Sequence, residues 1–135
     1  MKSNRKIALV TGGAKRIGQA ICKMLHASGI DLMIHYRHSS EEAKNLQQEL
    51  NEIRKDSASI IQADLLNLNV LPSLIQETMN TYGRLDILIN NASSYYPTEI
   101  GKMNEKNWND LIGSNLKAPL FLSQLAADEL IKAKG

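Results

Sequence analysis

The residues near the start of this chain that are best suited to chemistry are the glycines and cations between Thr11 and Gly18. The stretch reads Thr-Gly-Gly-Ala-Lys-Arg-Ile-Gly and follows a continuous apolar run at residues 7–10. A glycine turn between a buried strand and a helix directs free N–H groups and the positive end of the helix dipole at one spot, which suits a phosphate. The stretch therefore predicts a phosphate-binding turn, with an ordinary strand–helix turn as the alternative. Helical spacing of the next apolar residues supports the strand–turn–helix order: Ile17, Ala20, Ile21, Met24 and Leu25.

A second group of candidate residues lies about 20 positions after Gly18, where a dinucleotide-binding fold contacts the ribose 2′ position. It consists of Tyr36, Arg37, His38 and Ser39. A carboxylate at this place favours NAD, but this chain has the cation Arg37 and the hydroxyl of Ser39. Lys15 and Arg16 of the glycine turn can add positive charge. We therefore expect NADP (NADPH), and the alternative is that the charged residues lie in a solvated loop.

Polar residues also follow the third and fourth apolar runs. Asp64 comes after the third run, where its side chain can contact an adenine ring or cap the next helix. Residues 90–93 read Asn-Asn-Ala-Ser after the fourth run, and the asparagines can bond backbone groups on both sides of the strand end. Ser93 and Tyr95 then point to the place of a nicotinamide and a substrate. Tyr95 can stack on a flat heterocycle, or else Tyr95 and Tyr96 simply pack the loop.

The elements that must position these residues alternate along the chain. We expect strands at residues 7–10, 32–36, 57–62 and 86–89, each followed by a helix, with two helices after the last strand. This order predicts an α/β fold with a Rossmann-like, doubly wound parallel sheet, helices on both faces and strand order 3-2-1-4. Ligands bind such sheets where the winding reverses. The motifs after the first and fourth strands should therefore share one crevice.

Local signals predict where the helices begin and end. Gly29 should end the first helix, and Ser39 with Glu42 reads as a capping box for the second. Asn67 or Asn69 should cap the third. The second helix should carry an apolar stripe made up of Ala43, Leu46, Leu50 and Ile53. The third should have Pro72 in its first turn, end at Tyr82-Gly83 and turn inward Leu71, Leu74, Ile75 and Thr78. Asn104 should cap the fourth helix, and the last should cover about 116–134 with Pro119 in its first turn.

The composition is that of one globular domain. The chain has 135 residues, of which 43% are hydrophobic and 22% are charged, and its net charge of +2 does not indicate a nucleic-acid-binding protein. The single cysteine, Cys22, fits a structural role in a reduced, cytoplasmic setting. No apolar run approaches the length of a membrane span. We expect a cytoplasmic protein with no metal site and no nucleic-acid or membrane partner.

The motifs resemble those of the short-chain dehydrogenase/reductase family, and within it the pteridine reductases. The resemblance is carried by Thr11-Gly12 with Gly18, by Asn90-Asn91-Ala92 and by Asn115. Pteridine reductases have Thr-Gly-x-Ala-Lys-Arg-x-Gly and Asn-Asn-Ala-Ser-Ser-aromatic-Tyr-Pro at these places. Arg16 stands where the wider family usually has glycine. Arg37-His38 replaces the subfamily's His-Arg, so either cation is a candidate for the phosphate contact.

The resemblance implies hydride transfer from NADPH to a pterin or dihydrofolate-type substrate, with residues 1–135 as the NADP-binding domain. It implies a substrate site that includes Arg16, Ser93 and Tyr95, and a role for Asn115 in the catalytic proton relay. The candidate cofactor site is made up of Gly12, Lys15, Arg16, Ile17, Gly18, Tyr36, Arg37, His38, Ser39, Asp64, Leu65, Asn91, Ala92 and Ser93.

The resemblance also implies a catalytic serine, tyrosine and lysine, and this sequence ends before the place expected for them. The family uses a tyrosine with a lysine four residues later. Four residues after the tyrosines at 36, 82, 95 and 96, the chain has Ser40, Asp86, Glu99 and Ile100. Only Asn115 of that set remains. We therefore expect a chain truncated after the fourth strand and its following helices, unable to turn over a pterin by itself.

The last predicted helix carries more apolar surface than this part of a domain can cover, and in the family it builds the dimer interface. The resemblance therefore implies a homo-oligomer formed through it. The apolar residues are Leu116, Leu120, Phe121, Leu122, Leu125, Leu130 and Ile131. The fourth strand would be a sheet edge, although residues 87–89 are all apolar.

Two other functions stay open. A non-catalytic NADP-binding or dimerisation module agrees with the missing tyrosine and lysine, but it has no need of the polar and aromatic loop at residues 93–97. A short-chain reductase of another carbonyl substrate would use the same fold, with no stacking role for Tyr95.

Overall fold

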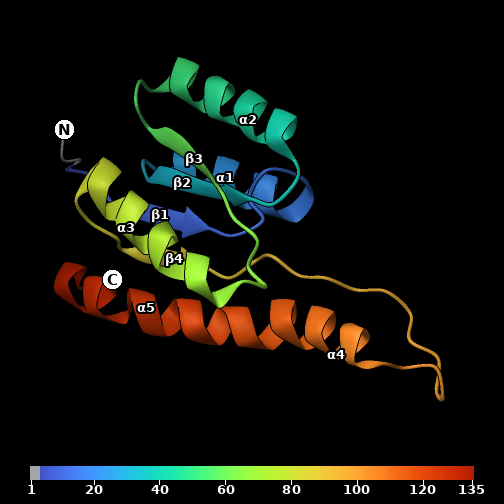
Figure 1. Cartoon of the computed structure of the whole chain (residues 1–135). Coiled ribbons are helices and arrows are strands. Elements are labelled where there is room, and N and C mark those ends of the chain that lie inside the picture. Colours follow the sequence, from blue (N-terminus) through green and yellow to red (C-terminus); the bar gives the residue numbers. More distant parts are fainter. Residues whose placement is uncertain (1–3) are drawn as a thin grey trace.

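The computed structural model describes residues 4–135, which form a parallel sheet covered by helices on both faces (Figure 1). The strands lie in the order β3-β2-β1-β4, which confirms the predicted order 3-2-1-4. Their bounds agree with the predicted ranges to within one residue: β1 (Ile7–Val10), β2 (Asp31–Tyr36), β3 (Ala58–Gln62) and β4 (Ile87–Ile89). Val10 lies opposite Ile34 on β2 and Ile89 on β4, so the carboxyl ends of the three strands meet at one edge.

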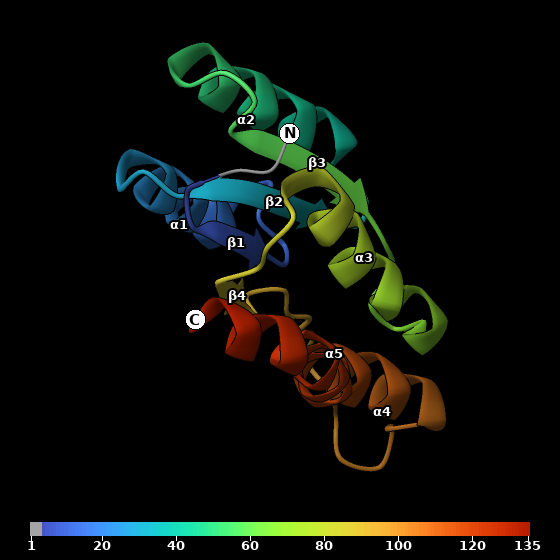
Figure 2. The same ribbon diagram turned by 90° about the vertical axis from the view of Figure 1, so that its left-hand side faces the viewer.

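The helices form a layer on each side of the sheet, as Figure 2 shows: α1 and α2 cover one face, and α3 and α5 cover the other. α4 lies beyond the sheet, roughly in line with α5 (Figure 1). The bounds are α1 (Arg16–Ala27), α2 (Ser40–Ile53), the short 3₁₀ turn η1 (Leu68–Val70), α3 (Leu71–Tyr82), α4 (Glu105–Ile112), the π turn η2 (Gly113–Lys117) and α5 (Ala118–Ala133). Within residues 4–135, no helix is both long and apolar enough to cross a membrane.

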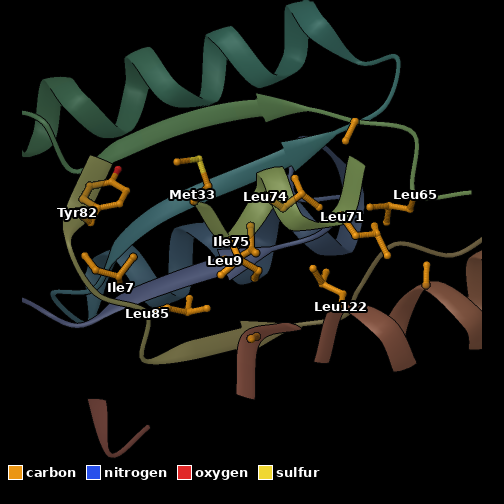
Figure 3. Close-up of a cluster of buried hydrophobic side chains, with 13 residues drawn as sticks. Ile7, Leu9, Met33, Leu65, Leu71, Leu74, Ile75, Tyr82, Leu85 and Leu122 are labelled. Carbon is orange, nitrogen blue, oxygen red and sulfur yellow. The ribbon is translucent and has the colours of Figure 1, made fainter. Parts of the chain in front are cut away.

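Two cores explain why β1 is apolar at every position. Successive side chains of a strand point to opposite faces. Ile7 and Leu9 therefore pack with the residues of α3 and α5 (Figure 3), whereas Ala8 and Val10 pack with those of α1 and α2. Cys22 belongs to the second core, where burial raises the pKa of its thiol to about 12. This environment confirms the structural role predicted for Cys22.

Several predicted helix ends are confirmed. Gly29 and Gly83 follow α1 and α3 in the left-handed conformation, with φ of +85° and +78°. Asn104 caps α4 through a reciprocal pair of hydrogen bonds with Asn107. Pro72 lies in the first turn of α3, where a missing N–H costs nothing.

The predicted caps of α2 and α3 are wrong. The Ser39 side chain makes no capping hydrogen bond, because its backbone (φ −79°, ψ 57°) departs from the extended conformation that an N-cap needs. Glu41 and Glu42 still place negative charge at the positive end of α2. The side chain of Asn67 caps η1, so α3 begins after Val70 without a side-chain cap.

The predicted apolar face of α1 is also wrong in detail. Gly18, Cys22 and His26 are the buried positions, whereas Ile17 and Met24 are 72% and 73% exposed. Gly18 decides this rotation, because it packs directly against the glycine turn and brings the residues four and eight positions later to the sheet. At the end of α2, Ile53 is likewise exposed, although Ala43, Leu46 and Leu50 of the same stripe are buried.

The last helix begins two residues later than predicted, and its end agrees with the prediction to within one residue. η2 occupies residues that were predicted to begin it, so α5 starts at Ala118 and ends at Ala133. Leu122 is buried, but much of the rest of its apolar surface is exposed, including Leu120 and Ile131. β4 lies at the edge of the sheet, as expected, and its apolar residues are half-buried, because among residues 4–135 it pairs only with β1.

A buried carboxylate fixes the start of β4. Asp86 accepts hydrogen bonds from the backbone N–H of Ile7 at 2.8 Å and from the Arg84 guanidinium at 2.8 and 2.6 Å. Burial opposes ionisation, but these hydrogen bonds outweigh it and hold the pKa of Asp86 below its usual value. The hydrogen bond from Ile7 to Asp86 thereby joins the start of β1 to the start of β4.

Replacing Asp86 with Asn should lower the free energy of unfolding by about 2 kcal/mol, because an amide group cannot accept both hydrogen bonds from Arg84. Since the pKa is lowered in the folded state, this stability is present above the unfolded pKa of about 3.9 and is lost as the pH falls through the native value. Urea titrations at neutral and acidic pH measure both effects. Asp128→Asn on the exposed face of α5 is the control, and an equal loss in both variants would contradict the prediction.

Candidate functional site

A cavity of about 470 Å³ lies at the carboxyl edge of the sheet. Four segments line it: the glycine turn with the start of α1, the residues after β2, the residues after β3, and the residues after β4. All fourteen residues predicted to bind the cofactor are among its lining. Its volume is within the range of small-molecule sites. The sheet topology thus brings together four segments that are far apart in the sequence.

The glycine turn is tied to the end of β4 by Thr11 and Asn91. The Thr11 hydroxyl accepts hydrogen bonds from the backbone N–H groups of Asn91 and Ala92, both at 3.0 Å. The Asn91 side-chain amide donates to the carbonyl oxygens of Thr11 and Gly12, both at 3.1 Å. These bonds confirm the expectation that an asparagine of the 90–93 segment bonds backbone groups at the strand end. Asn90 instead donates from its side chain to Ser123 of α5.

Glycine is required at two positions of the turn. Gly12 has φ of +61°, a conformation that residues with a Cβ rarely adopt. At Gly18, an added Cβ would lie 2.0 Å from the carbonyl oxygen of Gly12 and 2.7 Å from the side-chain nitrogen of Asn91. The start of α1 therefore touches the turn directly, and its N-terminus borders the cavity.

Arg16 adopts a backbone conformation that normally favours glycine, with φ of +54°. This strain gives a physical reason for the glycine that the wider family usually has at this place. A non-glycine residue in this region costs of order 1 kcal/mol or more, and such strain tends to persist at functional sites. In exchange, Arg16 brings a positive charge to the wall of the cavity.

The charge of the cavity wall is mainly positive. Lys15, Arg16 and Arg37 line it, and Asp64 is the carboxylate among its lining residues. Lys15 is the N-cap of α1, and its side chain makes no capping hydrogen bond. The first backbone N–H groups of α1 are therefore not occupied by the side chain of the N-cap residue. The wall is thus suited to an anion with several charges.

Arg37 and Asp64 form an ion pair on the wall of the cavity. The guanidinium of Arg37 donates to one oxygen of Asp64 at 3.0 Å, and each side chain is nearly half exposed. The other Asp64 oxygen accepts from the backbone N–H of Leu66 at 3.0 Å. Of the two expectations for Asp64, the structure shows a local turn in place of a helix cap, and it keeps the side chain on the cavity wall.

The loop after β4 is held by a polar cluster on α4. The Tyr96 hydroxyl donates to Asp110 at 3.0 Å, and Lys106 also bonds Asp110. The hydrogen bonds from Lys106 and Tyr96 lower the pKa of Asp110. Tyr95, by contrast, is 87% exposed and does not line the cavity. The expectation that both tyrosines pack the loop is therefore correct for Tyr96 and wrong for Tyr95.

Asn115 also lies outside the cavity lining, but its side chain holds Ser94, which is one of the lining residues. Its side-chain amide donates to the carbonyl oxygen of Ser94 at 2.7 Å, and its oxygen accepts from the Ser94 N–H at 3.1 Å. The residue lies in η2, and π turns are frequent at functional sites. Asn115 thus couples α4 and α5 to the loop after β4.

Sequence reasoning missed some residues of the cavity wall: Ala14, His35, Leu66, Ser94 and Ser114. The sequence contained a signal for His35, because a titratable residue directly after the apolar run 32–34, near the end of a predicted strand, is a candidate for the cavity wall. Ser114 had none, because only the π turn brings it to the wall.

Comparison with known proteins now bears on this geometry. The family model described as short chain dehydrogenase matches residues 6–135. The chain belongs to the short chain dehydrogenase family. This confirms the resemblance drawn from the glycine turn and the asparagines after β4, and it makes the chain part of a family of oxidoreductases.

Two relatives illustrate the similarity. Pteridine reductase 1 of Leishmania tarentolae is 34% identical over an alignment 164 residues long, gaps included, which covers 96% of this chain and 57% of the relative. The 3-oxoacyl-(acyl-carrier-protein) reductase FabG of Staphylococcus aureus is 31% identical over 129 residues, which cover 96% of this chain and 52% of the relative. The chain thus spans about half the length of these relatives.

Replacing Gly18 with Ala should destabilise the protein by about 3 kcal/mol, since the added methyl group overlaps the Gly12 carbonyl in a packed turn. Thermal and urea unfolding measure the loss. Gly101→Ala is the control: Gly101 has a positive φ but open space around it, so only backbone strain of about 1 kcal/mol applies. A Gly18→Ala variant no less stable than the control would contradict the close contact between α1 and the turn.

Proposed function

We propose that residues 1–135 are the NADP-binding part of a reductase that transfers hydride from NADPH to a pterin or dihydrofolate-type substrate. The observation that carries this proposal is the cavity itself, in which the uncapped start of α1 and the cation Arg37 face one space at the carboxyl edge of the sheet. A bound nicotinamide would supply the hydride. The residues of this chain bind and orient it.

The fit to a dinucleotide rests on complementary groups at separate parts of the wall. The glycine turn brings backbone close to the ligand without a Cβ, which suits a pyrophosphate. Arg37 and Ser39, after β2, lie where the ribose 2′ position is contacted in this kind of fold, and a cation there favours a 2′-phosphate. Asp64 and Leu65, after β3, are placed to border the adenine. Asn91, Ala92 and Ser93 border the nicotinamide end.

The proposal of a pterin substrate rests on the loop after β4 and on the name of one relative, pteridine reductase. Ser93 and Arg16 line the cavity, whereas Tyr95 stands exposed beside it and would have to move to stack on a substrate ring. The 3-oxoacyl-(acyl-carrier-protein) reductase is almost as similar. A reductase of another carbonyl substrate is therefore the second candidate.

A non-catalytic NADP-binding or dimerisation module is a further candidate. It is favoured because no tyrosine in these 135 residues has a lysine four positions later. Exposed apolar residues on η2 and α5, such as Leu116, Leu120 and Phe121, also offer a surface for a second copy of the chain.

For the reductase as well, we propose a homo-oligomer that forms through α5 and the adjoining η2.

Replacing Arg37 with Gln should weaken NADPH binding at least about tenfold and leave NADH binding within about twofold, because only the 2′-phosphate loses a charge-assisted hydrogen bond. Calorimetric titration with both nucleotides measures the ratio. Lys55→Gln removes the same charge from an exposed position between α2 and β3, and it should change neither constant. Equal weakening for NADPH and NADH in Arg37→Gln would refute the 2′-phosphate contact, and a folded chain that binds neither nucleotide would refute the proposed function.

By itself, the 135-residue chain should bind NADPH without oxidising it in the presence of a dihydropterin. The physical reason is that these residues offer no tyrosine–lysine pair to supply the proton that accompanies hydride transfer. Loss of NADPH absorbance measures turnover, and binding in the same sample is followed by NADPH fluorescence. Sustained turnover by the purified chain would contradict this expectation.

A further inference from the structure

His35 joins the glycine turn to the middle of the sheet. It lies next to the end of β2, and its side chain is buried, with 2% of the residue exposed. Its ring Nδ1 accepts a hydrogen bond from the backbone N–H of Gly12 at 3.1 Å. Its backbone carbonyl accepts from the N–H of Gly13 at 3.0 Å. One residue thereby holds two consecutive peptide groups of the turn.

The partners of the ring determine its protonation state. The Nε2 atom lies 2.9 Å from the carbonyl oxygen of Ala63, which can only accept, so Nε2 carries a proton. The N–H of Gly12 can only donate, so Nδ1 carries none. A second proton would set the Nδ1–H against the N–H of Gly12. The ring therefore supports the turn only as the neutral, Nε2-protonated tautomer.

The surroundings of the ring favour this neutral state. Burial lowers the pKa of His35, against smaller opposing effects of the Ala63 carbonyl and the Asp64 charge. The helices covering this face, α3 and α5, turn apolar residues such as Leu71 and Leu122 toward the sheet. The other charged or titratable side chains on the cavity wall are Lys15, Arg16, Tyr36, Arg37 and His38. Burial is therefore the cause that favours the neutral ring.

We propose that His35 is a positioning residue whose neutral ring holds the Gly12 peptide in its ligand-binding conformation, and whose protonation releases the turn and weakens dinucleotide binding. This inference rests on the proposed function for the identity of the ligand. The link between ring and turn is a property of the free chain as well.

The sign of the pH dependence follows from the direction of the pKa. Histidine in the unfolded chain titrates near 6.5. Because the folded pKa is lower, the stability that the neutral ring contributes is complete above about pH 6.5 and is lost as the pH falls through the folded value. Affinity for the dinucleotide should likewise fall as the pH decreases through the pKa of His35 in the folded chain.

Two substitutions separate the bonds of the ring. His35→Asn keeps an acceptor near the place of Nδ1 and cannot titrate. His35→Gln keeps a donor near the place of Nε2 but loses the acceptor for Gly12. At about pH 7.5, we expect His35→Asn to bind NADP⁺ within about threefold of the unmodified chain, and His35→Gln to bind it at least about tenfold more weakly.

Binding of NADP⁺ is measured by calorimetry at about pH 7.5 and about pH 5.5. As the pH falls toward the lowered pKa of His35, the unmodified chain should lose more affinity than His35→Asn. Titration of the 2′-phosphate is common to both proteins and cancels in this comparison. Equal pH dependence in the two proteins, or unchanged affinity in folded His35→Gln, would overturn the inference.

Nuclear magnetic resonance of the free chain tests the same link without a ligand. The His35 ring should be protonated at Nε2 alone at neutral pH, and the Gly12 amide resonance should move with the titration of His35. A Gly12 resonance that stays unchanged through that titration would overturn the inference. Absence of NADP⁺ binding by the unmodified chain at about pH 7.5 would instead refute the proposed function, so the two failures are distinguishable.

Discussion

The contact between Gly18 and the glycine turn is the constraint on which the rest of the site depends. No Cβ fits between Gly18 and the carbonyl of Gly12, so the start of α1 lies directly on the turn. That approach rotates α1 until Cys22 and His26 face the sheet, and it leaves Ile17 exposed at the cavity. One missing side chain thus sets the orientation of a helix and the position of its positive end.

The turn is held from both neighbouring strands. On one side, Thr11 and Asn91 bond it to the end of β4. On the other side, His35 bonds it to β2. A parallel sheet in the order β3-β2-β1-β4 makes this possible, because β1 lies between the two strands that support its turn. A ligand at this edge therefore meets backbone groups that are already ordered, which lowers the entropic cost of binding.

α4 and η2 support the site indirectly, because they hold the loop after β4. The π turn η2 interrupts the path from α4 to α5 and presents Asn115 to the backbone of Ser94. Tyr96 and Asp110 fasten the same loop to α4. β4 at the sheet edge and the apolar side of α5 are half covered in residues 4–135, in a chain that spans about half the length of the relatives it matches.

The sequence by itself determined the fold class, the strand order and most of the residues that line the cavity, because the apolar strands, the glycine turn and the segments after the strands are local patterns. Its errors concern faces and contacts. The inward face of α1 follows from the contact of Gly18 with the turn, and the missing cap follows from the backbone conformation of Ser39. The exposure of Tyr95 likewise has no signal in the local pattern. Only the tertiary structure placed His35 beneath Gly12, because a hydrogen bond across 23 residues leaves no periodic signal in a sequence.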